Sequence, residues 1–136
     1  MNRRTALLGA IASTLPLSDL AQSDEPLVLE RLITEVVAGG DVSVLPDLVA
    51  ADATIPDYDV SGIDAMIAAS EAGHQSRQEQ YSDYEFVIQA IAESDDWQLA
   101  YVRLIATTTA GEDEDTPGFY AARVVKGLIT ELYIGQ

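Results

Sequence analysis

The most informative segment of this sequence is WQLAYVRLIATTT, residues 97–109. The segment is rich in β-branched and aromatic residues, which is typical of a β-strand. Successive side chains of a strand point to opposite faces of the sheet. One face of this predicted strand therefore carries Leu99, Tyr101, Arg103 and Ile105, and the residues between them form the other face.

The segments on both sides of residues 97–109 also repeat with a period of two. Turn-forming residues separate them at 94–96 and at Lys126-Gly127. The acidic stretch 111–118 is expected to be a solvated loop. The predicted strands besides 97–109 are 85–93, 119–125 and 128–134, and the last two form a hairpin.

The register of this closing hairpin depends on the length of its turn. A two-residue turn at Lys126-Gly127 pairs Val124 with Ile129 and places Glu131 on the face of Tyr120. A three-residue turn shifts the register by one residue and sends Glu131 to the opposite face. Lysine is unusual at the first position of the two-residue turn, so we favour the longer turn and expect Glu131 in a surface pair.

The first half of the chain has the spacing of helices. A helix is expected from the capping region 23–26 to the stop at Gly39-Gly40, and Asp41 is expected to cap a second, shorter helix. A third helix is expected from about Ile63 to Gln80, with its later half, including His74, mostly solvated. Helices first and an antiparallel sheet afterwards predict a single α+β domain.

Composition and charge exclude several classes of partner. Of the 136 residues, 48% are hydrophobic, which suits one globular domain. The 23 Asp and Glu against 7 Lys and Arg give a formal charge of −16. Nucleic acid and anionic membranes are therefore not expected as partners. The acidity fits either adaptation to high salt or an ordinary acidic secreted protein.

The N-terminus has the layout of a secretory signal. Arg3-Arg4 precedes an apolar stretch at residues 6–17, as in a signal peptide of the twin-arginine type. We expect residues 1–21 to be this signal, residues 22–136 to be the mature domain, and the domain to be exported to the periplasm or the medium. The alternative is an N-terminal helix docked on the domain.

Four short motifs occur in an order and spacing that cover about residues 27–134. They are AGGD at 38–41 with Leu45 and Leu48, Asp52 with GIDA at 62–65, IAE at 91–93 followed by Trp97 and a Thr-rich turn near Gly111, and RVVKGLITE at 123–131.

Together these motifs resemble the SnoaL-like family of the NTF2-like (nuclear transport factor 2) superfamily. The resemblance implies a cone in which N-terminal helices pack on a curved antiparallel or mixed sheet. It also implies a homodimer, because sheets of this family commonly dimerise. Known members include polyketide cyclases, limonene-type epoxide hydrolases, isomerases and proteins without demonstrated activity, so the fold does not give the function.

This sequence departs from the catalytic patterns of that family. Tyr120 stands where the resemblance places the acid–base aspartate of the cyclases, and a tyrosine is a poor base at neutral pH. Arg103 is followed by Leu104-Ile105, where the epoxide hydrolases have an aspartate. The resemblance places Arg103 inside the cone; the alternative is an outer-face arginine bonded to an acid of a neighbouring strand.

We therefore expect the cone to bind a small, largely apolar molecule. If the protein is an enzyme, Arg103 is the expected electrophile and Asp57 the base of an isomerase, cyclase or hydrolase reaction. No cofactor or metal is expected, because the sequence has one histidine and no cysteine. The alternative is a non-catalytic dimeric interaction module with a filled cone. The expected ligand-binding residues are Tyr101, Arg103, Tyr120, Asp57, Tyr58 and Trp97.

Overall fold

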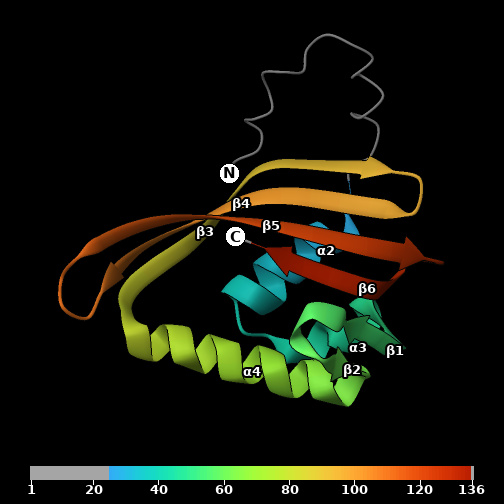
Figure 1. The fold of residues 1–136 in the computed structure, drawn as a ribbon, viewed down its shortest axis with the longest axis horizontal. Helices are drawn as coiled ribbons and strands as arrows, with labels where there is room; N and C mark the ends of the chain where they lie inside the picture. The colour runs from blue at the N-terminus through green and yellow to red at the C-terminus, as the bar shows by residue number, and fades with distance from the viewer. Residues whose placement is uncertain (1–24, 136) are drawn as a thin grey trace, which may run out of the picture.

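The computed structural model describes residues 25–135 of the chain (Figure 1). The expected signal peptide at residues 1–21 lies outside the described residues. Within them, no helix is long and apolar enough to cross a membrane. In chain order the elements are α2 (Val28–Arg31), η1 (Leu32–Ala38), η2 (Val42–Val44), α3 (Leu45–Leu48), β1 (Val49–Ile55), η3 (Pro56–Tyr58), β2 (Val60–Ser61), α4 (Ile63–Gln80), β3 (Tyr81–Ser94), β4 (Trp97–Thr108), β5 (Asp113–Val125) and β6 (Leu128–Gly135).

The strands form one curved, mixed sheet in the order β2-β1-β6-β5-β4-β3. Strands β1 and β6 are parallel, and every other neighbouring pair is antiparallel. The helices lie on one side of this sheet, and the long strands β3 to β5 bend around them (Figure 1). The expected α+β class, with helices packed on a curved sheet, is confirmed.

The first helical run ties the N-terminal part of the domain to the sheet. Leu29, Ile33 and Val36 follow one another at helical spacing, and all three are buried against the sheet. The buried Gln98 of β4 accepts a hydrogen bond from the backbone N–H of Leu29 at 2.9 Å. This bond supplies a partner for one of the free N–H groups at the helix start.

Two helical segments begin where their local sequence predicts, whereas α2 begins at Val28, later than the start expected from the capping region 23–26. Asp41 caps η2 by accepting a hydrogen bond from the Ser43 N–H, and α4 has the expected bounds Ile63–Gln80. Gly40 adopts a φ of +73°, and a Cβ there would lie 2.6 Å from the ring of His74. His74 is thus half-buried rather than solvated, and its Nδ1 lies 3.4 Å from the Tyr84 hydroxyl.

The expectation of a solvated loop at residues 111–118 is wrong for most of its length. Strand β5 begins at Asp113, because β4 continues far enough to pair with it, with Ile105 opposite Asp115. Asp113 and Asp115 remain exposed, so the local sequence gives no apolar signal for a strand. The actual loop is confined to the turn around Gly111.

The closing hairpin has the turn of one predicted alternative and the register shift of the other. The turn has two residues, with positive φ at Lys126 and Gly127, so the expected three-residue turn is wrong. A bulge between the pairs Val124–Ile129 and Arg123–Glu131 then adds the one-residue shift. Glu131 consequently lies on the outer face, 3.5 Å from Arg123, as expected for a surface pair.

Candidate functional site

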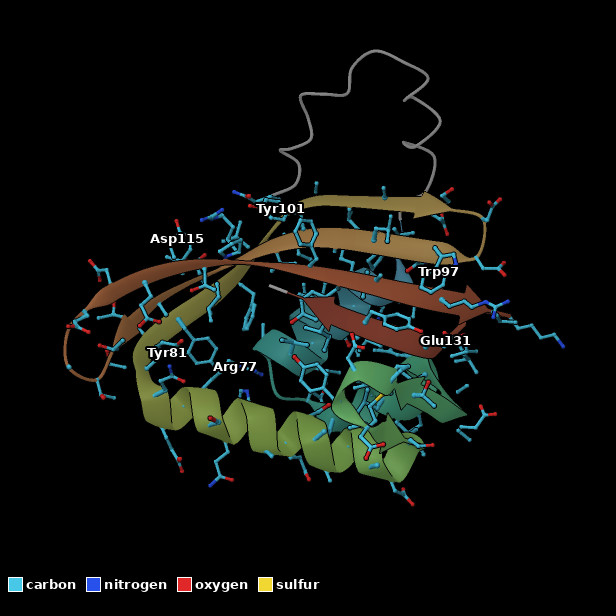
Figure 2. The ribbon with its side chains drawn as sticks, viewed as in Figure 1. Arg77, Tyr81, Trp97, Tyr101, Asp115 and Glu131 are labelled. Carbon is cyan, nitrogen blue, oxygen red and sulfur yellow. The ribbon has the colours of Figure 1, made fainter. Side chains whose placement is uncertain are left out.

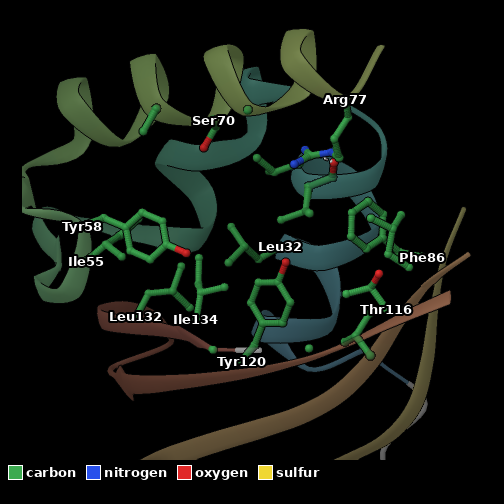
Figure 3. Close-up of a pocket in the computed structure, with 18 of the residues that line it drawn as sticks. Leu32, Ile55, Tyr58, Ser70, Arg77, Phe86, Thr116, Tyr120, Leu132 and Ile134 are labelled. Atoms are coloured by element: carbon green, nitrogen blue, oxygen red, sulfur yellow. Dashed lines mark hydrogen bonds between the residues drawn. The ribbon is translucent and has the colours of Figure 1, made fainter. Parts of the chain in front are cut away.

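A cavity of about 370 Å³ lies between α4 and the inner face of the sheet (Figure 3). Helix α4 covers it from one side, η1 contributes another wall, and strands β3 to β6 form its floor. The apolar part of its lining comprises Leu32, Val36, Val37, Ile55, Val60, Met66, Ala69, Phe86, Val102, Leu104, Pro117, Leu132 and Ile134. These side chains suit the hydrocarbon part of a small molecule.

Two tyrosine hydroxyls enter this apolar space (Figure 3). Tyr120 projects from β5 and is only 8% exposed, and its hydroxyl makes no hydrogen bond to the described residues. Tyr58 comes from η3 and is 59% exposed, so its ring forms part of the rim. Burial raises the pKa of Tyr120, with a lowering contribution from Arg77 and a smaller raising one from Tyr58. At neutral pH Tyr120 is therefore a neutral hydrogen-bond donor.

Arg77 reaches toward the same cavity from α4 (Figure 3). Its Nη2 donates a 2.7 Å hydrogen bond to the carbonyl oxygen of Val37, and its guanidinium carbon lies 5.3 Å from the centre of the Phe86 ring. Its Nε is buried and has no hydrogen-bond partner. The cavity thus has one cationic group beside two tyrosine hydroxyls.

Acid–base groups are missing from the described cavity wall. None of its lining residues is Asp, Glu or His. One carboxylate contacts a lining residue from outside the wall, because the hydroxyl of Tyr81 donates to Glu114 at 3.1 Å. In residues 25–135, no group of three His, Asp or Glu side chains is placed to hold a metal ion. The wall can bind and orient a molecule, but it offers no carboxylate or imidazole as a base.

Arg103 and Tyr101 do not face the interior, so their expected place in the ligand site is wrong, and the alternative of an outer-face arginine bonded to an acid of a neighbouring strand is the one observed. Both lie on the outer face of β4, on the side of the sheet away from α4, as the position of Tyr101 in Figure 2 shows. Arg103 Nε donates to Asp115 at 2.6 Å, and its Nη1 donates to the Tyr101 hydroxyl at 2.9 Å. The pairing with Asp115 supplies the reason, because an arginine is costly in an apolar interior without such a partner.

Trp97 and Asp57 also lie away from the cavity wall. Trp97 is on the outer face, where its ring centre lies 6.0 Å from that of Tyr133. Asp57 is exposed in η3, next to Tyr58, and does not line the cavity. Of the six residues expected to bind a ligand, the structure brings Tyr58 and Tyr120 together at the cavity and leaves the other four outside it.

Two parts of the cavity wall were not predicted from the sequence. One is Arg77, which was assigned to the solvated half of the third helix, and the other is the start of β5 at residues 116–118. Met66, Ser70, Gly73 and Arg77 follow at intervals of four, three and four residues, so they share one helix face. Following this spacing from the apolar residue Met66 along α4 would have predicted that Arg77 lies on the helix face that covers the cavity.

Comparisons with known proteins give the fold. No protein-family model matches the chain, and no curated protein matches its sequence. Among solved structures, a candidate SnoaL-like polyketide cyclase from a Jannaschia species is 17% identical, with a TM-score of 0.63 over 83% of this chain and 89% of the other. TsrD from Streptomyces laurentii is 15% identical, with a TM-score of 0.63 over 89% and 90% of the two chains.

A third similar structure is a protein from Catenulispora acidiphila with a ketosteroid isomerase-like fold, solved in complex with trimethylamine. It is 13% identical, with a TM-score of 0.63 over 82% of this chain and 85% of the other. Likeness at such identities shows a shared fold. The expected cone, with the NTF2-like fold, is therefore confirmed as an architecture.

Proposed function

We propose that this domain binds a small, largely apolar molecule in its cone, with the hydroxyls of Tyr120 and Tyr58 orienting one polar group of that molecule. The observation that carries this proposal is the cavity of about 370 Å³, which has mostly apolar walls and into which the hydroxyl of Tyr120 projects without a hydrogen-bond partner among residues 25–135. Its volume lies within the range of about 300–1,000 Å³ usual for small-molecule sites.

The size of the cavity itself supports a ligand. Leu32, Phe86 and Leu132 approach from three different elements and leave a space between them that is partly open to solvent. Without a ligand, water contacts these apolar side chains. A molecule that fills the space removes their surface from water, which favours a binding role.

Binding rather than acid–base catalysis is the function that the wall supports. Similar structures include candidate polyketide cyclases, and one was solved with trimethylamine, which supports a ligand-binding cone. Cyclisation or epoxide hydrolysis requires a proton acceptor near the substrate. Arg103 and Asp57 do not line this cavity, and no other described carboxylate does so.

A second candidate role is assembly through the outer face of the sheet. Leu99, Ile105 and Phe119 are exposed on this face, and the Phe119 ring lies 4.9 Å from that of Tyr101. Exposed apolar groups of this kind favour a protein–protein contact. A homodimer would leave the cavity on the opposite face free, so this role is compatible with ligand binding.

Export remains part of the proposal. It rests on Arg3-Arg4 and the apolar residues 6–17, which together have the layout of a twin-arginine signal. The domain would then work in the periplasm or outside the cell, where a pronounced negative charge keeps it soluble.

The binding proposal is tested by filling the cavity from α4. We expect 2-naphthamide, a neutral probe with two fused rings and one carbonyl, to bind the full chain with a Kd of about 10 μM to 1 mM. Ser70 lines the cavity and Ser76 is exposed on the same helix. Ser70→Phe should abolish the binding measured by isothermal titration calorimetry, and the matched Ser76→Phe should retain it. Absence of binding to the wild-type chain, or equal binding to both variants, would contradict the proposal.

A further inference from the structure

The described arginines differ in whether they have a carboxylate partner. Arg31 pairs with Glu35 at 2.8 Å, Arg103 with Asp115 at 2.6 Å, and Arg123 with Glu131 at 3.5 Å. Arg77 has no carboxylate within salt-bridge distance among residues 25–135. Because acidic residues outnumber basic ones by 23 to 7, an arginine that lacks an acidic partner needs an explanation.

The fold holds the guanidinium of Arg77 at the cavity by two contacts. One is the hydrogen bond from Nη2 to the carbonyl oxygen of Val37, which belongs to the last turn of η1 and so lacks an intrahelical partner. The other is the position of the guanidinium 5.3 Å from the Phe86 ring centre.

These contacts leave part of the guanidinium without acceptors. Its Nε is buried and unpartnered, and Nη1 makes no hydrogen bond to the described residues. A buried donor without an acceptor costs free energy, so such groups are rare in folded proteins. Among residues 25–135, the protein supplies no group at the cavity wall that carries a negative charge.

We propose that the molecule bound in the cone carries a carboxylate, which accepts hydrogen bonds from Nη1 of Arg77 and from the hydroxyl of Tyr120. The proposal rests on the proposed binding function and names the class of ligand for the same cavity, a small apolar carboxylic acid in its ionised form. A planar guanidinium matches a planar carboxylate and binds it with charge-assisted hydrogen bonds.

The charge distribution makes Arg77 decisive for such a ligand. The chain as a whole carries −16 charges and repels anions in solution. Inside the cavity, Arg77 is the one charged residue in the described lining. Burial raises the pKa of Tyr120 and keeps its hydroxyl protonated, so it donates to the anion rather than repelling it.

The test compares two probes of the same shape, 2-naphthoate and 2-naphthamide, by calorimetry on the full chain at neutral pH. We expect naphthoate to bind about ten-fold more tightly than naphthamide, because a hydrogen bond to a charged group is stronger than one between neutral groups. In Arg77→Met the ten-fold preference should vanish while naphthamide still binds. Arg103→Met removes a positive charge on the outer face and should leave the preference unchanged.

The outcomes separate this proposal from the binding function on which it rests. If naphthamide binds and naphthoate binds no more tightly, the carboxylate proposal is overturned and the binding function stands. If neither probe binds, the binding function itself fails. Should Arg77→Met lose its fold by circular dichroism, Arg77→Gln keeps a neutral donor for Val37, and an unchanged preference in that variant would overturn the proposal.

Discussion

The inner and outer faces of β4 carry alternate residues of one strand, and they serve different purposes. On the inner face, Val102 is fully buried and its neighbour Leu104 lines the cavity. On the outer face, Arg103 is hydrogen-bonded to Asp115 and Leu99 is exposed. Both faces contain large apolar residues, so the alternation indicates two faces without indicating which of them the helices cover.

Two arginines, one on the outer face of the sheet and one at the cavity, differ in their partners. Arg103 lies outside, where an aspartate on the neighbouring strand satisfies its charge. Arg77 lies at the cavity, where a backbone carbonyl and an aromatic ring hold it and no carboxylate of the described residues comes within salt-bridge distance. An arginine that the protein has already paired is structural, whereas an unpaired one at a cavity is available to a ligand.

The largest expected effect compares one substitution on the two faces. Leu132 on β6 faces inward and is 3% exposed, whereas Leu99 on β4 faces outward and is 46% exposed. Leu132→Ala should lower the free energy of unfolding by about 2–3 kcal/mol, because it enlarges an internal cavity. Leu99→Ala should lower it by about 1 kcal/mol or less, since less apolar area is removed from contact.

Urea unfolding of the two variants at pH 7 measures this difference. Equal losses of unfolding free energy would mean that the outer face is buried as deeply as the inner one, for example in a homodimer. Repeating the measurement over a range of protein concentrations identifies that case, because the stability of a dimer depends on concentration.

A smaller effect is expected from removing one hydroxyl on each face. Tyr120→Phe should weaken binding of 2-naphthamide about five-fold, which corresponds to one lost neutral hydrogen bond. Tyr101→Phe removes a hydroxyl that accepts from Arg103 on the outer face, and it should leave this affinity unchanged. Isothermal titration calorimetry measures the affinity of both variants for 2-naphthamide. A five-fold weaker affinity in Tyr101→Phe, and not in Tyr120→Phe, would show that the probe binds the outer face of the sheet.

The smallest effect is a difference in titration between two tyrosines. Burial raises the pKa of Tyr120 inside the cavity, whereas the hydrogen bond to Glu131 raises the pKa of Tyr133 on the outer face. Glu131→Gln should return the pKa of Tyr133 toward its ordinary value and leave that of Tyr120 raised. Arg77→Met should raise the pKa of Tyr120 further, because Arg77 lowers it, and should leave that of Tyr133 as it is.

Because the pKa of Tyr120 is raised in the folded protein, the stability of the protein also depends on pH. The folded-state pKa of Tyr120 lies above its unfolded value, so its contribution to stability is complete below the unfolded pKa of about 10 and is lost as the pH rises through the folded pKa. Nuclear magnetic resonance titration of ring-labelled tyrosines follows both residues. A Tyr120 that titrates at its ordinary pKa would show that the cavity is open to water.

Much of the fold could be predicted from short stretches of sequence. The bounds of α4, the cap at Asp41 and the long strand beginning at Trp97 depend on neighbours within a few residues. The extension of β5 back to Asp113 could not be predicted in this way. Its exposed acidic residues carry no apolar period, and only pairing with β4 makes the segment a strand.

For the candidate site, prediction succeeded where the family resemblance supplied an aligned position. Tyr120 was expected in the cone because the resemblance places it where the cyclases have their acid–base aspartate, and the structure places it at the cavity wall. Arg103 was misplaced because its face depends on where the helices dock, which its own strand does not encode. Arg77 was missed because its importance comes from the absence of an acidic partner, and that absence is a property of three-dimensional neighbours.

Residue order along the chain is therefore sufficient for the α+β class, for most helix and strand bounds, and for the acidity of the surface, since each follows from local periodicity or from composition. The inward face of β4, the bulge that sends Glu131 outward and the unpaired Arg77 beside Phe86 follow from contacts between residues that are distant in sequence. These contacts form only when the sheet curves under α4. Packing against that helix, rather than alternation along a strand, selects which side chains line the cavity.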